Sequence, residues 1–182
     1  AHKGTSMMTI QLEGASGHSS DPSLGANALD AMHRVMGELI AMREELAAVN
    51  QNNAFAVNVP TMNLGCMRAG DNPNRICGHA ALQIDLRLLP GMDSEAIHEA
   101  LERRIAAVVE NTGVSLQLHK AYPPIPPFQS DPNGELLLTL SGLSGNQPGT
   151  VAFGTEAHFM QTLGMETVVW GPGNIDLSLI HI

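Results

Sequence analysis

The chain has 182 residues, a formal net charge of −9 and only 9 Lys and Arg. Nucleic-acid binding needs clustered cationic side chains, so this charge argues against a nucleic-acid partner. No apolar stretch approaches the roughly 20 residues that a membrane-spanning helix needs. Cys66 and Cys77 lie in a sequence without a secretory signal, so we expect free thiols and a cytoplasmic location.

The N-terminal third alternates between the periodicities of strands and helices. Residues 7–12 alternate apolar and polar side chains, which predicts a half-buried strand, and a Gly- and Ser-rich loop follows at 14–22. Residues 24–46 have apolar positions spaced by three and four, which predicts a helix. Its buried stripe is expected to be Ala28, Met32, Val35, Leu39, Met42 and Leu46. Residues 59–67 predict a second strand, with Met62, Leu64 and Cys66 on one side.

The same alternation continues to residue 118. Residues 80–89 form the clearest strand pattern and end at Pro90. Asp93 is a good N-cap for a helix that Gly113 ends, and residues 114–118 predict a fourth strand. The order β-α-β-β-α-β predicts an α+β, ferredoxin-like domain over 5–120, with a four-stranded antiparallel sheet and two helices on one face.

The remaining residues predict an incomplete α/β unit over 121–176. A Pro-rich segment at 122–132 reads as an extended linker, and 133–143 has the pattern of a helix. Short strands are expected at 150–153 and 167–170, on either side of a short helix that ends near Leu163. The domain boundary is therefore placed in the linker.

Function is indicated by an ordered set of short segments rather than by any one motif. The set is GHSSDP at 17–22 with GANA at 25–28, NRI at 74–76 with DLRLLPGM at 85–92, PPIP at 123–126, and FGTEA at 153–157 with GPG at 171–173. In this order the segments resemble the metallopeptidase/aminoacylase family that includes succinyl-diaminopimelate desuccinylase, glutamate carboxypeptidase and aminoacylase. Within that family the chain is most similar to bacterial acetylornithine deacetylases, over residues 1 to about 176.

The resemblance implies a zinc-dependent (or cobalt-dependent) hydrolase that acts on linear amide bonds. In the family, a catalytic domain holds the metal and a Glu general base, while an inserted ferredoxin-like dimerisation/lid domain forms a homodimer and helps cover the site. The chain would then hold the inserted domain (5–120) and only the C-terminal part of the catalytic domain (121–176). The metal ligands would precede Ala1, so we expect this fragment to be inactive and to bind no catalytic zinc.

The resemblance also implies the substrate. The full-length protein would remove the acyl group from a small-molecule N-acyl amino acid, converting N-acetylornithine to ornithine in arginine biosynthesis. The alternative from another class is a non-catalytic ferredoxin-like dimerisation or ligand-sensing module. The FGTEA and GPG segments favour the enzyme, since a stand-alone module has no need of them.

Five residues are candidates for the site. The resemblance implies that His18 reaches the partner subunit's active site and donates a hydrogen bond to the developing oxyanion; the alternative is a histidine of a surface loop. Asn74 and Arg75 suit recognition of a substrate carboxylate, or form a solvated turn. Gly154 and Thr155 suit close approach of a ligand to the backbone, or an ordinary strand-to-helix turn in which Thr155 caps the helix. No metal ligand is assigned.

The last six residues depart from the family pattern. Leu179 stands where a ligating His would align, and His181 matches no family position. We expect residues 177–182 to be a non-native tail. Asp85 and Arg87 share a strand face and are expected to form a structural ion pair.

Overall fold

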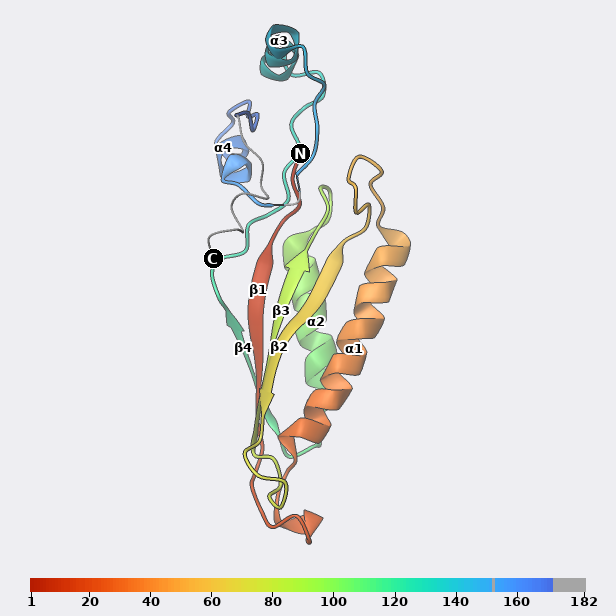
Figure 1. Ribbon diagram of the computed structural model, residues 1–182, viewed down its shortest axis with the longest axis vertical. Coiled ribbons are helices and arrows are strands. Elements are labelled where there is room, and N and C mark those ends of the chain that lie inside the picture. Colours follow the sequence, from red (N-terminus) through yellow and green to blue (C-terminus); the bar gives the residue numbers. More distant parts are fainter. Residues whose placement is uncertain (152, 172–182) are drawn as a thin grey trace.

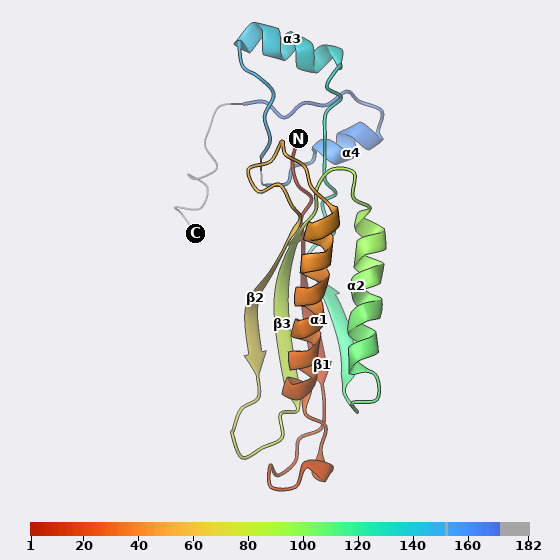
Figure 2. The same ribbon diagram turned by 90° about the vertical axis from the view of Figure 1, so that its right-hand side faces the viewer.

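The computed structural model describes residues 1–151 and 153–171, and its first 120 residues form a sheet covered by two helices (Figures 1 and 2). The strands run in the order β2-β3-β1-β4, and each pairs antiparallel with its neighbours. The elements are β1 (Ser6–Glu13), α1 (Ala28–Val49), β2 (Thr61–Ala69), β3 (His79–Arg87), α2 (Ser94–Val109) and β4 (Ser115–Lys120). The predicted ferredoxin-like α+β fold is confirmed.

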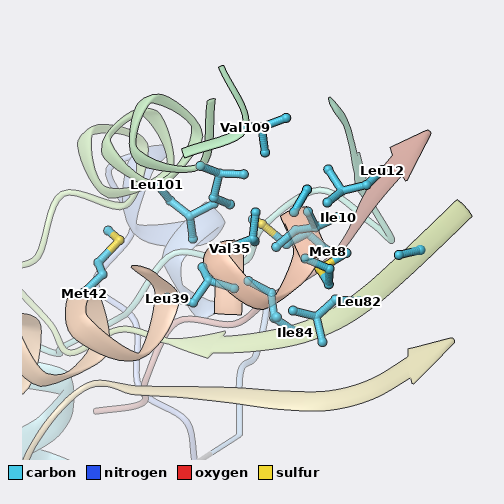
Figure 3. Close-up of a cluster of buried hydrophobic side chains, with 14 of the residues drawn as sticks. Met8, Ile10, Leu12, Val35, Leu39, Met42, Leu82, Ile84, Leu101 and Val109 are labelled. Carbon is cyan, nitrogen blue, oxygen red and sulfur yellow. The ribbon is translucent and has the colours of Figure 1, made fainter. Parts of the chain in front are cut away.

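The core lies between the two helices and the face of the sheet that they cover. Ile10 and Leu12 of the central strand β1 are fully buried. Figure 3 shows them in one cluster with Val35 and Leu39 of α1 and Leu101 of α2. At roughly 25 cal/mol for each Å² of apolar surface removed from water, side chains of this size contribute about 1.5–3 kcal/mol each.

Helix α1 begins later than its apolar pattern predicted. Asn27 is the N-cap, and its side-chain oxygen accepts from the backbone N–H of Leu29 at 3.0 Å and of Asp30 at 3.3 Å. Residues 22–24 instead form a short 3-10 turn, and Leu24 is 57% exposed. The prediction of a helix from 24 was wrong at its start because an Asn side chain that satisfies the first N–H groups outcompetes a continued apolar spacing.

Strand β2 contains an irregularity that the alternation did not predict. The pairing with β3 shifts register between Leu64 and Cys66, which leaves Gly65 without a partner. Met62 is buried on the helix side, but beyond the bulge Cys66 pairs with Gln83 and is exposed. The prediction that Cys66 shares a side with Met62 was therefore wrong, since one extra residue reverses the direction of every later side chain.

Two groups of ion pairs lie on the surface of the domain, one between the two helices and one on the sheet. Arg104 of α2 reaches across to α1, where it contacts Glu38 and binds Glu45 through two nitrogens. The carboxylates of Glu45 and Glu38 hold the pKa of the Arg104 guanidinium above its usual value. On the sheet, Arg87 Nε lies 3.0 Å from both Asp85 oxygens, so the predicted structural ion pair is confirmed.

The C-terminal segment contains two helices, α3 (Glu135–Ser144) and α4 (Ala157–Thr162), which lie near the N-terminus (Figure 1). The predicted strand at 167–170 does not form, and at 150–153 the described residues show only a single bridge between Val151 and His2. A strand is stabilised by a neighbouring backbone, and 167–170 pairs with no described residue. No described helix has the length and apolarity to cross a membrane.

His98 is a buried polar residue at the junction of α2 with β1. Its Nδ1 donates to the Ser94 carbonyl at 2.5 Å, and its Nε2 accepts from the Ser6 hydroxyl at 2.8 Å. Burial lowers the pKa of the His98 imidazole, partly opposed by the hydrogen bond to Ser94. The neutral ring is therefore the form that the fold accommodates.

We predict that the free energy of unfolding falls as the pH drops below the ordinary histidine value of about 6.5. Below that pH the histidine of the unfolded chain is protonated while folded His98 stays neutral. Each such group therefore lowers the free energy of unfolding by about 1.4 kcal/mol per pH unit until its lowered pKa is reached. Chemical denaturation at a series of pH values measures the slope. His98→Gln should reduce it, whereas His119→Gln, at an exposed strand position, should not. Equal slopes in all three proteins would contradict this assignment.

Candidate functional site

Two loops at one end of the sheet bring three of the predicted site residues together. We call this end, residues 14–27 and 70–78, the tip; it lies at the bottom of Figure 1. His18 and Arg75 form an isolated antiparallel β-bridge. On either side of it, the Ser19 N–H donates to the Asn74 carbonyl at 3.0 Å, and the Ile76 N–H donates to the Gly17 carbonyl at 2.8 Å. His18, Asn74 and Arg75 are therefore held beside each other by backbone pairing.

The hydrogen bonds of His18 define which ring nitrogen carries the proton. The Ser20 N–H lies 3.3 Å from Nδ1 and can only donate, so Nδ1 is an acceptor; the Ser20 hydroxyl lies 2.8 Å from the same atom. In the neutral ring Nε2 therefore carries the proton. Among the described residues Nε2 has no hydrogen-bond partner, and the side chain is exposed. The tip presents an N–H donor to solvent.

Charged side chains lie on the same two loops as this donor. Arg75 Nη1 lies 2.5 Å from Asp71, and both side chains are more than half exposed. Such a pair contributes at most about 1 kcal/mol, so a ligand carboxylate could replace Asp71 at little cost. Asp21 accepts from the Ser23 hydroxyl at 2.6 Å, and hydrogen bonds from the hydroxyl and N–H of Ser23 hold the Asp21 pKa below its usual range.

Two glycines allow the two ends of the 14–27 loop to approach each other closely. A Cβ on Gly14 would lie 2.1 Å from the Ala26 carbonyl oxygen, and one on Gly25 would lie 2.3 Å from the Ala15 carbonyl oxygen. Both contacts are with backbone atoms, which cannot turn away as a side chain can. The path of the chain into the His18 loop therefore depends on these glycines.

Gly154 and Thr155 lie at the other end of the sheet. A Cβ on Gly154 would be 3.0 Å from the Thr5 methyl group, just before β1 begins. The Thr155 N–H donates to His2 Nε2 at 3.3 Å, and its hydroxyl oxygen accepts from the Ala157 N–H at 3.2 Å. The N-cap of α4 is Glu156, so the expected alternative of Thr155 as the cap is wrong by one residue. The Thr155 hydroxyl can still donate its own proton to a ligand.

The two groups of candidate residues are not brought together within one chain. Strand β1 separates them, and its eight residues extend about 26 Å at roughly 3.3 Å per residue. A single site that used both His18 and Thr155 would need the tip of one chain and the Gly154 turn of another.

The described residues do not fit a catalytic metal. No three His, Cys, Asp or Glu side chains among residues 1–151 and 153–171 lie close enough to hold one ion. A zinc or cobalt ion in the full-length protein would need ligands from elsewhere. His181 and the GPG segment beyond Gly171 lie outside the described residues.

Sequence reasoning missed His2 and Asp71. Asp71 is four residues before Arg75, but in a turn this spacing carries no signal. His2 is fully buried because segments near 128 and 151 pair with it, which nothing in the local sequence indicates.

Comparison with known proteins links this geometry to a family. A family model described as a peptidase dimerisation domain matches residues 1–113. The match includes every helix and strand from β1 to α2 and the whole tip, and it ends just before β4.

Solved structures share the fold at low sequence identity. A putative aminohydrolase from methicillin-resistant Staphylococcus aureus has a TM-score of 0.68 at 17% identity, covering 88% of this chain and 41% of that one. A tripeptidase from Staphylococcus aureus has a TM-score of 0.61 at 15% identity (91% and 42% covered), and a hydantoinase/carbamoylase family amidase from Burkholderia vietnamiensis has 0.62 at 16% (87% and 37%). The chain therefore spans about two fifths of the length of these proteins.

We predict that Gly25→Ala destabilises the domain by about 1–3 kcal/mol, because the new methyl group would overlap the Ala15 carbonyl oxygen. Gly37→Ala, in the middle of α1 with nothing within 4 Å of the added atom, is the matched control. It should stabilise by about 0.5–1 kcal/mol. Urea denaturation measures both, and a Gly25→Ala protein as stable as the unsubstituted chain would contradict the close approach.

Proposed function

The chain belongs to the peptidase dimerisation domain family, and from this we propose that it is part of a metal-dependent hydrolase of N-acyl amino acids. We propose N-acetylornithine as the substrate and a cytoplasmic location, as expected from the resemblance to acetylornithine deacetylases. In this proposal residues 5–120 are the dimerisation/lid domain, and 121–176 belong to the catalytic domain.

One observation carries the proposal: the tip holds an imidazole whose Nδ1 accepts from Ser20, which leaves Nε2 as an outward N–H donor beside an arginine, about 26 Å along β1 from the Gly154 turn. A dimer supplies the second tip that a composite site needs. His18 of one subunit would then meet Gly154 and Thr155 of the other. A ferredoxin-like module without catalytic function has no need of this donor.

The proposed role of His18 is to stabilise charge. Amide hydrolysis develops negative charge on the carbonyl oxygen, and a preorganised donor at that oxygen is worth about 2.7–4 kcal/mol. Ser20 fixes the ring with Nε2–H outward, so the donor is in place before the substrate binds. A neutral ring can do this without the cost of a buried charge.

Asn74 and Arg75 are proposed to recognise the substrate's α-carboxylate. Asp71 uses one Arg75 nitrogen, and a planar guanidinium keeps others for two parallel hydrogen bonds. The exposed carboxylates of Asp71 and Asp21 make the same tip favourable for a cation. A ligand with a carboxylate and an ammonium group, as N-acetylornithine has, matches both charges.

The metal would come with other residues of the full-length protein. Bound there, zinc or cobalt would supply Lewis-acid activation of the amide. The described residues of this chain contribute substrate contacts and the hydrogen-bond donor, and no ligand set.

A surface for the proposed homodimer is present on α1. Leu29 and Ile40 are 40% and 37% exposed, and Met36 is half-buried between them. Strand β2 is an outer strand of the sheet, so one of its edges pairs with no described strand. An exposed apolar stripe beside an open edge favours association through a two-fold axis.

We predict that Ile40→Lys weakens dimerisation at least tenfold, because it places a charge in the apolar stripe. Val49→Lys is the matched control: Val49 is 79% exposed and lies nine residues, or about 180°, around α1 from Ile40. Light scattering over a concentration series measures both. A strictly monomeric unsubstituted chain at high micromolar concentration would contradict the proposed dimer.

For the full-length protein we predict that His18→Ala lowers turnover of N-acetylornithine about 10²–10³-fold, with folding and metal content unchanged. Mixing His18→Ala subunits with subunits lacking the implied Glu general base should restore activity, because one of the two sites in the mixed dimer is then intact. Near-normal turnover of His18→Ala, or no recovery on mixing, would reject the proposed role of His18.

A further inference from the structure

His2 connects the start of the chain with the Gly154 turn. Its backbone N–H donates to the Phe128 carbonyl at 2.8 Å, and it bridges Val151 on the other side. The side chain is fully buried, with its ring centroid 5.5 Å from that of Phe128. His2 thus lies at the centre of three segments that are remote in sequence.

Both ring nitrogens of His2 have defined partners. Nδ1 lies 2.9 Å from the Lys3 carbonyl oxygen, which can only accept, so Nδ1 carries the proton. The Thr155 N–H lies 3.3 Å from Nε2 and can only donate, so Nε2 is unprotonated. The neutral Nδ1–H tautomer satisfies both partners, whereas a doubly protonated ring would place two N–H groups against each other at Thr155.

We propose that neutral His2 is a positioning residue that fixes the Gly154–Thr155 turn through its hydrogen bond from the Thr155 N–H. The Thr5 methyl group leaves little space for a side chain at Gly154, and His2 accepts the hydrogen bond from the next residue, Thr155. The relevance of this positioning to substrate binding rests on the proposed function. The hydrogen bond and its dependence on protonation can be tested without any substrate.

The charges around His2 all act against its protonation. Burial lowers the pKa of the imidazole, the hydrogen bond to the Lys3 carbonyl opposes this, and the positive charges of the Ala1 ammonium and of His158 lower it further. The Lys3 ammonium is also close in sequence, but its Nζ is directed to the Val59 carbonyl at 2.6 Å. Glu156, the nearest carboxylate in sequence to Thr155, is exposed. The turn is therefore held at neutral pH and released as the pH falls through the lowered pKa of His2.

The first experiment is nitrogen NMR of the imidazole in the 182-residue chain at pH 7.5. We expect a protonated Nδ1 and an unprotonated Nε2, which is the less common tautomer of free histidine. An Nε2–H tautomer would overturn the proposal, because Thr155 would then have no acceptor. This measurement needs no variant and so does not depend on whether a substituted chain folds.

The second experiment follows the Thr155 amide. His2→Gln keeps an acceptor that does not titrate, and His2→Phe keeps a ring on Phe128 but removes the acceptor. At pH 7.5 we expect His2→Phe to lose about tenfold in hydrogen-exchange protection at Thr155, and His2→Gln to stay within about threefold of the unsubstituted chain. Equal protection in the unsubstituted and Phe chains would overturn the proposal.

The pH titration of the Thr155 amide shift separates His2 from its neighbour His158. The shift should change only as the pH falls below the ordinary histidine value of about 6.5, because burial lowers the pKa of His2. The change should be lost in His2→Gln and kept in His158→Gln. A titration that disappears with His158 instead would overturn the proposal.

Kinetics of the full-length protein test the link to the proposed function. We expect His2→Phe to raise KM several-fold more than it lowers kcat, with His2→Gln restoring KM. A full-length protein that does not deacylate N-acetylornithine would remove the proposed function but leave the hydrogen-bond results standing. An active enzyme whose KM is the same with His2→Phe and His2→Gln as without them would overturn the positioning role alone.

Discussion

The position of β1 in the middle of the sheet is the constraint on which the rest of the structure depends. It pairs with β3 along one edge and β4 along the other, so all its backbone groups within the ladder are satisfied by neighbours. Its even-numbered side chains are buried beneath the helices. A change of register here would turn the entire set toward solvent, so the core fixes the strand rigidly.

The rigidity of β1 also sets the functional geometry. The segment before it, from Ala1 to Thr5, binds the linker and the Gly154 turn, while the loop after it carries His18. The two candidate groups are therefore attached to opposite ends of one stiff element, and no loop motion of ordinary size brings them together. This favours a site shared between two chains over one built within a single chain.

The two histidines at these ends use opposite tautomers, and the difference follows from their partners. Ser20 donates to Nδ1 of His18, which leaves the Nε2 proton exposed as a donor. The Lys3 carbonyl instead accepts a hydrogen bond from the Nδ1–H of His2, which leaves Nε2 as an acceptor. Exposure suits the first for contact with a ligand. Complete burial suits the second for fixing a turn, because a buried hydrogen bond has no competing water.

Local pattern was enough to determine the elements of the fold from β1 to β4. Alternation and helical spacing identified the strands and helices, and Asp93 was correctly identified as the cap of α2. The set of short segments also indicated the family. These features are encoded in neighbouring residues, whose side-chain directions and hydrogen-bonding habits are independent of distant contacts.

Tertiary structure alone decided the rest. The bulge at Gly65 that turns Cys66 outward depends on pairing with β3, and the failure of 167–170 to form a strand depends on the lack of a described partner. The neighbourhood of His18 and Arg75 depends on two loops that meet only when the sheet has formed. The burial of His2 and its hydrogen bond from the Thr155 N–H were invisible in the sequence because they are set by where segments more than a hundred residues away pack against it.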